Sequence, residues 1–204
     1  MELPAVILAG GAARRLGGAC KPDLDLSGTR LLDHVLEALR AARAELGCAG
    51  ETVVVAPPEV RVPEGITRVL EDPPRGGPLA GLTAGLDALT RDTPFVAALA
   101  CDAPRAPEAL PNLVRRLIDA PRTDGAIALD PDGREQYLLG IYRCAALAAR
   151  REQWEAEVGA LRGGSLRRFV APLSLVRLEL PHALTHDIDT PADLDAAAGS
   201  LGSS

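Results

Sequence analysis

A glycine-rich, basic segment near the N-terminus has the composition of a loop that binds phosphate groups. After an apolar stretch that ends at Leu8, its informative positions are Ala9, Gly10, Gly11, Arg14, Arg15 and Lys21. Glycines let a backbone approach a ligand closely, and successive free N–H groups form a concavity that binds anions. With the cationic side chains, this predicts a polyphosphate ligand; the alternative is an ordinary turn with a solvated basic face.

The segment follows neither of the two commonest phosphate-binding patterns. A Walker loop requires G-x-x-x-x-G-K-[ST] and a dinucleotide loop requires G-x-G-x-x-G, and this chain contains neither in that region. We therefore expect the loop to wrap phosphates by a different scheme.

Asp102 comes two residues after the end of an apolar stretch, Phe95–Ala100. A carboxylate at the end of a buried strand points into the crevice of an α/β sheet, and its oxygens suit Mg²⁺ that is shared with substrate phosphates. A helix N-cap or a turn is the alternative role, because prolines follow at 104 and 107.

A second acidic segment lies near the C-terminus. Thr190 and Asp193 form a capping box with proline at the first helical position, which leaves Asp187 and Asp189 unexplained. Alternation places these two side chains on the same side of an extended segment. They are interpreted either as further metal ligands or as solvated loop acids.

Composition limits the class of protein. The chain has 204 residues, 47% of them hydrophobic and 2% aromatic, and a net charge of −6. The scarcity of aromatic residues argues against base-stacking platforms, and the negative charge disfavours a general nucleic-acid or membrane surface. Basic residues within an acidic chain indicate a specific anion site.

The cysteines and histidines form no recognised metal or redox motif. The four cysteines are widely spaced without a C-x-x-C pair. No hydrophobic run is long enough to span a bilayer, and no signal peptide is evident. We expect a cytoplasmic protein with reduced thiols.

Strand-like and helix-like stretches alternate along the chain. Apolar or β-branched runs predict strands at 3–8, 52–56, 66–70, 94–100, 125–129, 137–142 and 173–178. Periodicity predicts helices at 31–46, 77–89, 107–118, 145–161 and 191–198. Near-continuous apolar strands between helices predict a three-layer, Rossmann-like α/β fold with a mostly parallel sheet and helices on both faces. We expect one domain over residues 1–198 and a flexible C-terminal tail over 199–204.

Four motifs occur in order along nearly the whole chain. They read L-A-G-G-x-x-R-R-x-G-G…K (Leu8–Lys21), E-D…G-P-L-A-G (Glu71–Gly81), C-D-x-P (Cys101–Pro104) and D-I-D-T-P-x-D-L (Asp187–Leu194). In this combination the chain resembles the molybdenum cofactor guanylyltransferases (MobA-like) of the nucleotidyltransferase superfamily. Each motif alone is weak, but the four together, G-P-L-A-G among them, favour this family over its sugar-phosphate relatives.

The resemblance implies transfer of GMP from GTP to the terminal phosphate of the molybdenum-pterin cofactor, with release of pyrophosphate. It implies Mg²⁺ as cofactor, GTP and the molybdenum cofactor (molybdopterin) as small-molecule substrates, and a molybdenum insertase or molybdoenzyme chaperones as candidate protein partners. Neither nucleic acid nor a membrane is expected as a partner. The implied nucleotide contacts are Leu8, Ala9, Gly10, Gly11, Arg14, Lys21, Asp72, Gly77, Pro78 and Leu79. The implied catalytic residues are Arg15, Lys21 and Asp102, and the implied metal ligands are Asp102 and Asp189.

The acceptor side is less defined. A second cluster of glycines and arginines, Gly163–Phe169, either binds the pterin's phosphate or is an amphipathic helix with exposed arginines. Gly133–Tyr137, which leads into a predicted strand, is the other segment considered for the acceptor side.

One departure from the family pattern concerns the base. Relatives often carry an Asn after the second long strand, whereas this chain reads Val55-Ala56-Pro57-Pro58, and proline also removes a backbone donor. This keeps open a cytidylyl- or sugar-phosphate nucleotidyltransferase with the same core. A nucleotide-binding module without turnover is the third possibility, and the presence of Lys21 and Asp102 argues against it.

Overall fold

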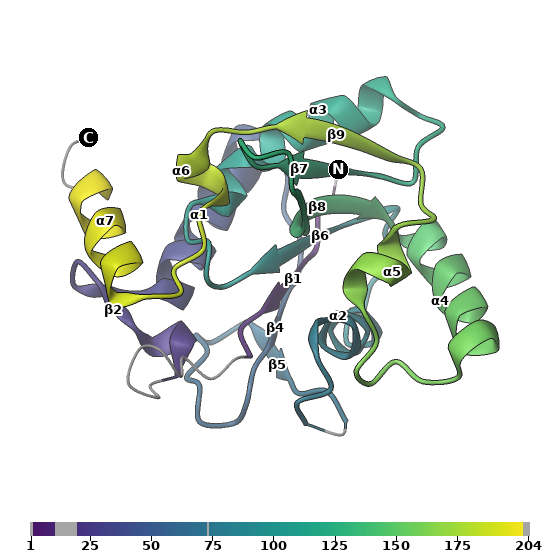
Figure 1. Ribbon diagram of the computed structural model, residues 1–204, viewed down its shortest axis with the longest axis horizontal. Helices are drawn as coiled ribbons and strands as arrows, with labels where there is room; N and C mark the ends of the chain where they lie inside the picture. The colour runs from purple at the N-terminus through teal and green to yellow at the C-terminus, as the bar shows by residue number, and fades with distance from the viewer. Residues whose placement is uncertain (1, 11–19, 73, 202–204) are drawn as a thin grey trace.

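The computed structural model describes residues 2–10, 20–72 and 74–201, in which a twisted sheet lies between two layers of helices (Figure 1). The strands of this sheet are β1 (Ala5–Leu8), β4 (Thr52–Val55), β5 (Thr67–Val69), β6 (Phe95–Ala100), β7 (Gly125–Leu129), β8 (Glu135–Arg143) and β9 (Leu175–Glu179). They are ordered β5-β4-β1-β6-β8-β7-β9.

The sheet is parallel except at one strand. β5, β4, β1 and β6 pair in parallel, as do β7 and β9, whereas β8 is antiparallel to both of its neighbours. The expected mostly parallel α/β fold is confirmed. The reversed strand allows β7 and β8 to be joined by a short turn, which a parallel pair does not permit.

Helices cover both faces of the sheet. They are α1 (Leu31–Glu45), α2 (Pro78–Asp87), α3 (Leu110–Asp119), α4 (Cys144–Val158), α5 (Leu166–Val170), α6 (His182–Thr185) and α7 (Pro191–Leu201). One buried cluster joins α1 and α3 to the first face, and another joins α2, α4 and α5 to the second (Figure 1).

Alternation along the strands separates the two cores. In β1, Ala5 and Ile7 belong to the core beneath α1 and α3, whereas Val6 belongs to the core beneath α2, and all three are fully buried. Both cores are mainly aliphatic, as the composition requires. Trp154 and Phe169 meet edge to face and hold α5 against α4.

Several elements differ from those expected from the sequence. The residues predicted as one helix over 107–118 form a 3₁₀ turn, η3 (Ala106–Ala109), followed by α3. The short helix α6, the 3₁₀ turn η2 (Lys21–Asp23) and a hairpin of β2 (Asp25–Leu26) with β3 (Thr29–Arg30) were not expected. α7 continues to Leu201, three residues past the end placed at 198.

Gly85 is expected to be essential for the packing of α2 on the sheet. An added Cβ would lie 2.3 Å from Val6 Cγ1 and 3.0 Å from Val55 Cγ2, and these β-branched side chains have little freedom to move. We expect Gly85→Ala to lower the free energy of unfolding by about 1–3 kcal/mol, which outweighs the roughly 0.5–1 kcal/mol that alanine gains in a helix.

Urea denaturation measures this effect, with Gly81→Ala as the matched control on the same helix. At Gly81 the nearest atom to an added Cβ is Leu8 Cδ2 at 3.3 Å, so its loss of stability is expected to be smaller. Equal stability changes in the two variants would contradict the packing argument.

Candidate functional site

The carboxyl end of β1 lies at the centre of the sheet, between β4 and β6. The N–H of Ala9 donates to Val55 O at 2.9 Å, and Leu8 O accepts from the N–H of Cys101 at 3.0 Å. The strands that follow β1 in the sequence are added first on one side of it and then on the other. Ligands of open α/β sheets bind at the point where the strand order reverses in this way. Gly10, which is exposed, is the first residue past the sheet pairing.

Three predicted site residues meet beside this point. Lys21 Nζ donates to Asp102 Oδ2 at 2.9 Å and to Asp189 Oδ1 at 2.5 Å. The Lys21 side chain is 14% exposed, while those of Asp102 and Asp189 are 30% and 58% exposed. The ammonium group therefore lies between two carboxylates that remain accessible to a ligand.

Backbone hydrogen bonds fix the position of these acids. Asp102 follows β6, and its carbonyl accepts from Ile188 N at 2.9 Å, which ties the C-terminal segment to the end of that strand. Asp193 accepts from the backbone of both Asp189 and Thr190, and its own N–H donates to Thr190 Oγ1. The expected capping box is present, and it orients Asp189.

The described residues of the site carry more negative than positive charge. Burial opposes the charge on Lys21, but the carboxylates of Asp102 and Asp189 outweigh it and raise the lysine's pKa. The pKa of Asp187 is raised to about 6, first by burial of its carboxyl group and then by the nearby charges of Asp102 and Asp189. Asp187 thus joins the same acidic group.

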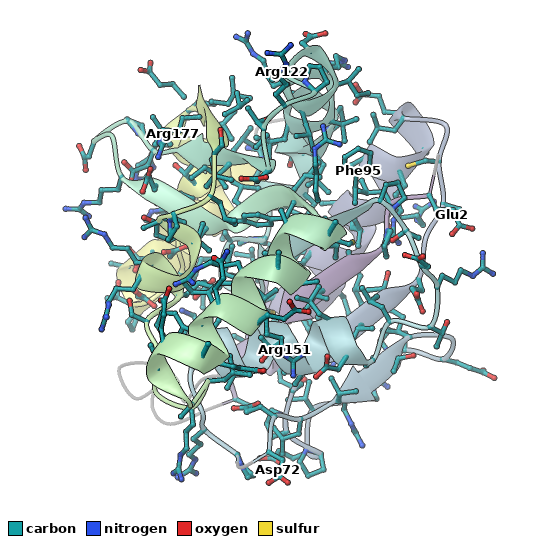
Figure 2. The ribbon with its side chains drawn as sticks, turned by 90° about the vertical axis from the view of Figure 1, so that its right-hand side faces the viewer. Glu2, Asp72, Phe95, Arg122, Arg151 and Arg177 are labelled. Atoms are coloured by element: carbon teal, nitrogen blue, oxygen red, sulfur yellow. The ribbon has the colours of Figure 1, made fainter. Side chains whose placement is uncertain are left out.

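The conformation of the loop before α2 depends on the side chain of Glu71 and on a glycine at the start of the helix. Glu71 Oε1 accepts from Arg75 N and Gly76 N at 2.9 and 3.2 Å. Gly77 precedes α2 with φ +91°, a conformation that favours glycine. Asp72 is exposed on this loop (Figure 2).

The remaining predicted nucleotide contacts fall into two groups. Pro78 is exposed at the start of α2, whereas the side chain of Leu79 is fully buried in the core, so only its backbone remains available for a ligand. Gly11, Arg14 and Arg15 lie outside the described residues.

The second glycine and arginine cluster supports the loop before α2. Gly163 N donates to Gly76 O at 2.7 Å, and a Cβ on Gly164 would lie 2.7 Å from Leu79 Cδ2. Arg168 lies over the Trp154 ring with its guanidinium carbon 5.9 Å from the centroid. Part of this cluster, α5, is the amphipathic helix that the sequence left as one of two possibilities.

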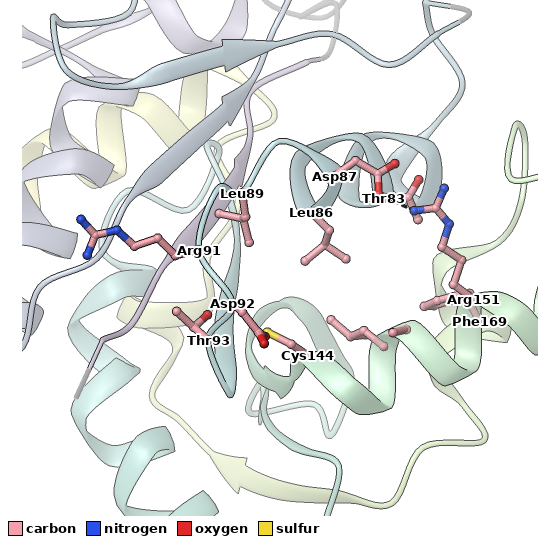
Figure 3. A pocket seen from close by; sticks show the side chains of 12 residues that line it. Thr83, Leu86, Asp87, Leu89, Arg91, Asp92, Thr93, Cys144, Arg151 and Phe169 are labelled. Carbon is pink, nitrogen blue, oxygen red and sulfur yellow. Dashed lines mark hydrogen bonds and ion pairs between the residues drawn. The ribbon is translucent and has the colours of Figure 1, made fainter.

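A separate cavity of about 250 Å³ lies between the end of α2 and α4 (Figure 3). Leu86, Leu147 and Phe169 line it, and Arg151 pairs with Asp87 at 2.5 Å on its rim. It contains none of the predicted site residues.

The thiols do not contribute to the site. All four cysteines are free, and burial raises the pKa of Cys101 far above its usual range, which makes it inert. Within the described residues, no three His, Cys, Asp or Glu side chains are arranged to hold a metal by themselves. No helix in that part of the chain is both long and apolar enough to cross a membrane.

Known sequences match this chain over most of its length. Residues 5–177 match the family model of the MobA-like NTP transferase domain. A molybdenum cofactor guanylyltransferase of Acidiphilium cryptum is 34% identical over 201 residues, covering 96% of this chain and 94% of that protein. One of Shewanella putrefaciens is 31% identical over 139 residues, covering 67% of this chain and 66% of that protein.

Solved structures share the fold. Molybdopterin-guanine dinucleotide biosynthesis protein A from Archaeoglobus fulgidus has a TM-score of 0.70 and 22% identity, covering 98% of this chain and 100% of that chain. The 2-C-methyl-D-erythritol 4-phosphate cytidylyltransferase from Thermus thermophilus has a TM-score of 0.68 and 20% identity, covering 99% of this chain and 100% of that chain.

The resemblance drawn from the four motifs is confirmed by the family match, which extends from β1 into β9. The chain belongs to the MobA-like NTP transferase family.

Proposed function

We propose that this chain transfers GMP from GTP to the terminal phosphate of the molybdenum-pterin cofactor and releases pyrophosphate. The observation that carries the proposal is the contact of Lys21 with Asp102 and Asp189 at the carboxyl edge of the sheet. The names of the relatives from Acidiphilium cryptum and Shewanella putrefaciens support this choice of substrates.

The chemistry requires positioning and neutralisation of charge more than a side-chain nucleophile. An oxygen of the acceptor phosphate attacks the α-phosphorus of GTP, and the bond from that phosphorus to the bridging oxygen of pyrophosphate breaks. Two anions must approach one another, so electrostatic stabilisation dominates. Lys21 supplies a cation beside the reacting phosphates, and the backbone at Gly10 lets the nucleotide approach the end of β1.

The acidic group fits a divalent cation. Among the described residues, the carboxylates of Asp102, Asp187 and Asp189 outnumber the Lys21 ammonium, and carboxylate oxygens are hard ligands that suit Mg²⁺. Mg²⁺ commonly binds one or two carboxylates together with substrate phosphates. This agrees with the described residues, in which no three potential ligands are arranged to hold a metal ion without a substrate. Asp102 and Asp189 would hold the ion, and when bound it neutralises developing phosphate charge.

A second candidate is cytidylyl transfer by the same core. No side-chain amide follows β4: Ala56 is buried, and the carbonyl of Pro57 accepts from Val60 N at 3.1 Å within a turn. This is the specific observation that favours a base other than guanine.

Calorimetric titration with GTP, CTP and ATP, each with Mg²⁺, tests the choice of base. We expect GTP to bind at least about tenfold more tightly than the others, and pyrophosphate to be released when the phosphorylated pterin acceptor is added. Preference for CTP would select the cytidylyl alternative. Binding of GTP without pyrophosphate release from any acceptor would favour a non-catalytic module.

A further inference from the structure

A polar cluster at the start of β8 has no part in the proposed phosphate chemistry. We call it the Glu135 cluster; its members are Glu135, Tyr137, Arg167 and Arg177. Glu135 Oε1 accepts from Arg177 Nε at 2.5 Å, and the Tyr137 hydroxyl donates to the other carboxylate oxygen. Arg177 projects from β9, which is separated from β8 by β7 (Figure 2).

The pairing of β8 with β7 is irregular beside the cluster. Pairing with β7 jumps from Ile127 opposite Gly140 to Ala128 opposite Gln136. Such bulges bend a strand and redirect its side chains, and they are frequent beside active sites. Here the bulge falls at the carboxyl end of β7, the same edge at which Lys21 and Asp102 meet.

The two neighbouring arginines of α5 have different surroundings. Arg168 lies over Trp154. Arg167 is exposed, and its guanidinium makes no hydrogen bond or ion pair with the described residues. Tyr137 and Arg177 lower the pKa of Glu135, and the charge of Arg167 adds to them. The pKa of Tyr137 is raised by burial and by Glu135, and the charge of Arg167 acts in the opposite direction.

The cluster lies at the same edge of the sheet as the proposed site. On one side, Gln136 Nε2 of β8 donates to Asp130 Oδ2 at 3.1 Å, and Asp130 follows β7 at its carboxyl end, the edge of the sheet that also carries Asp102. On the other side, the loop that leads into α5 bonds to the loop before α2 through Gly163 and Gly76. A substrate bound at Lys21 would have to extend along this edge of the sheet to meet Arg167.

Resting on the proposed function, we propose that the Glu135 cluster binds the heterocyclic end of the acceptor, a planar ring system with amino and ring N–H groups. Arg167 stacks over the ring, because a planar guanidinium packs well on aromatic faces. Glu135 accepts hydrogen bonds from the amino and ring N–H groups, which resemble the guanidinium N–H that Arg177 now presents to it.

Arg167→Ala tests the proposal, with Arg168→Ala as its neighbour and control. We expect Arg167→Ala to raise the acceptor KM by about tenfold or more while leaving the dissociation constant of GTP unchanged. Arg168→Ala is expected to lower the melting temperature, because it removes packing on Trp154, without changing the acceptor KM. Glu135→Gln is expected to raise the acceptor KM as well.

A fluorescent pterin that carries a phosphomonoester gives a second readout, independent of turnover. If the wild type transfers GMP but Arg167→Ala changes neither the acceptor KM nor pterin binding, the proposed subsite is overturned and the proposed function stands. If the wild type transfers no GMP but binds the pterin in a manner that requires Arg167, the function falls and the subsite is supported. Absence of pterin binding to the wild type overturns the subsite.

Discussion

Replacement of Asp102 by Asn is expected to lower kcat by about 10³-fold while the protein stays folded. The change keeps the size of the side chain and removes the charge at the end of β6 that is best placed to hold Mg²⁺ against the α-phosphate. It also weakens the hydrogen bond from Lys21, now 2.9 Å long. Since Asp102 is 30% exposed, we expect the loss of stability to stay below about 1 kcal/mol.

Pyrophosphate release at saturating GTP and acceptor measures this effect, and thermal unfolding checks the fold. Asp195→Asn is the matched control, since Asp195 is exposed on α7 and lies outside the proposed site. We expect the control to retain wild-type kcat. Near-normal turnover of Asp102→Asn would remove this residue from the metal site.

The layers of the fold follow from local patterns, but the direction of one strand does not. Val6 and Ile7 pack into opposite cores, and the resulting apolar runs identify strands buried on both faces. β8 shows a similar apolar run, although it is antiparallel to β6 and β7. Burial of the strand determines this apolar pattern, and the pattern is the same whether the strand is parallel or antiparallel to its neighbours. The length of the turn after β7 is the one signal that could have indicated the reversal.

The sequence names candidate site residues one by one, but it does not predict the contacts between them. Lys21 and Asp189 were chosen for separate roles, one on phosphate and one on metal, yet they touch across 168 positions of sequence. The sequence alone does not decide between the two interpretations of Asp187, because only the fold places its carboxyl group near Asp102. The neighbours Arg167 and Arg168 are chemically identical in the sequence, and only the position of Trp154 distinguishes them.

Replacement of Lys21 by Ala is expected to weaken GTP binding by about 10²-fold. The variant loses the cation that faces the phosphates, and it also leaves Asp102 and Asp189 without the partner that balances them. Uncompensated carboxylates repel the nucleotide's phosphates, so the loss should exceed that of one missing hydrogen bond. Calorimetric titration with GTP and Mg²⁺ measures it; an unchanged affinity would place the phosphate site elsewhere.

A double-mutant cycle separates charge balance from direct contact with phosphate. Asp189→Asn removes one carboxylate from the acidic group while its backbone stays capped by Asp193. If charge balance dominates, Asp189→Asn in the Lys21→Ala background should recover part of the lost affinity when GTP is titrated without Mg²⁺, since no metal ion then neutralises the remaining carboxylates. If Lys21 acts only by touching the phosphates, the second substitution recovers nothing. Partial recovery would therefore mean that Lys21 both binds the nucleotide and keeps its acidic neighbours compatible with a polyanion.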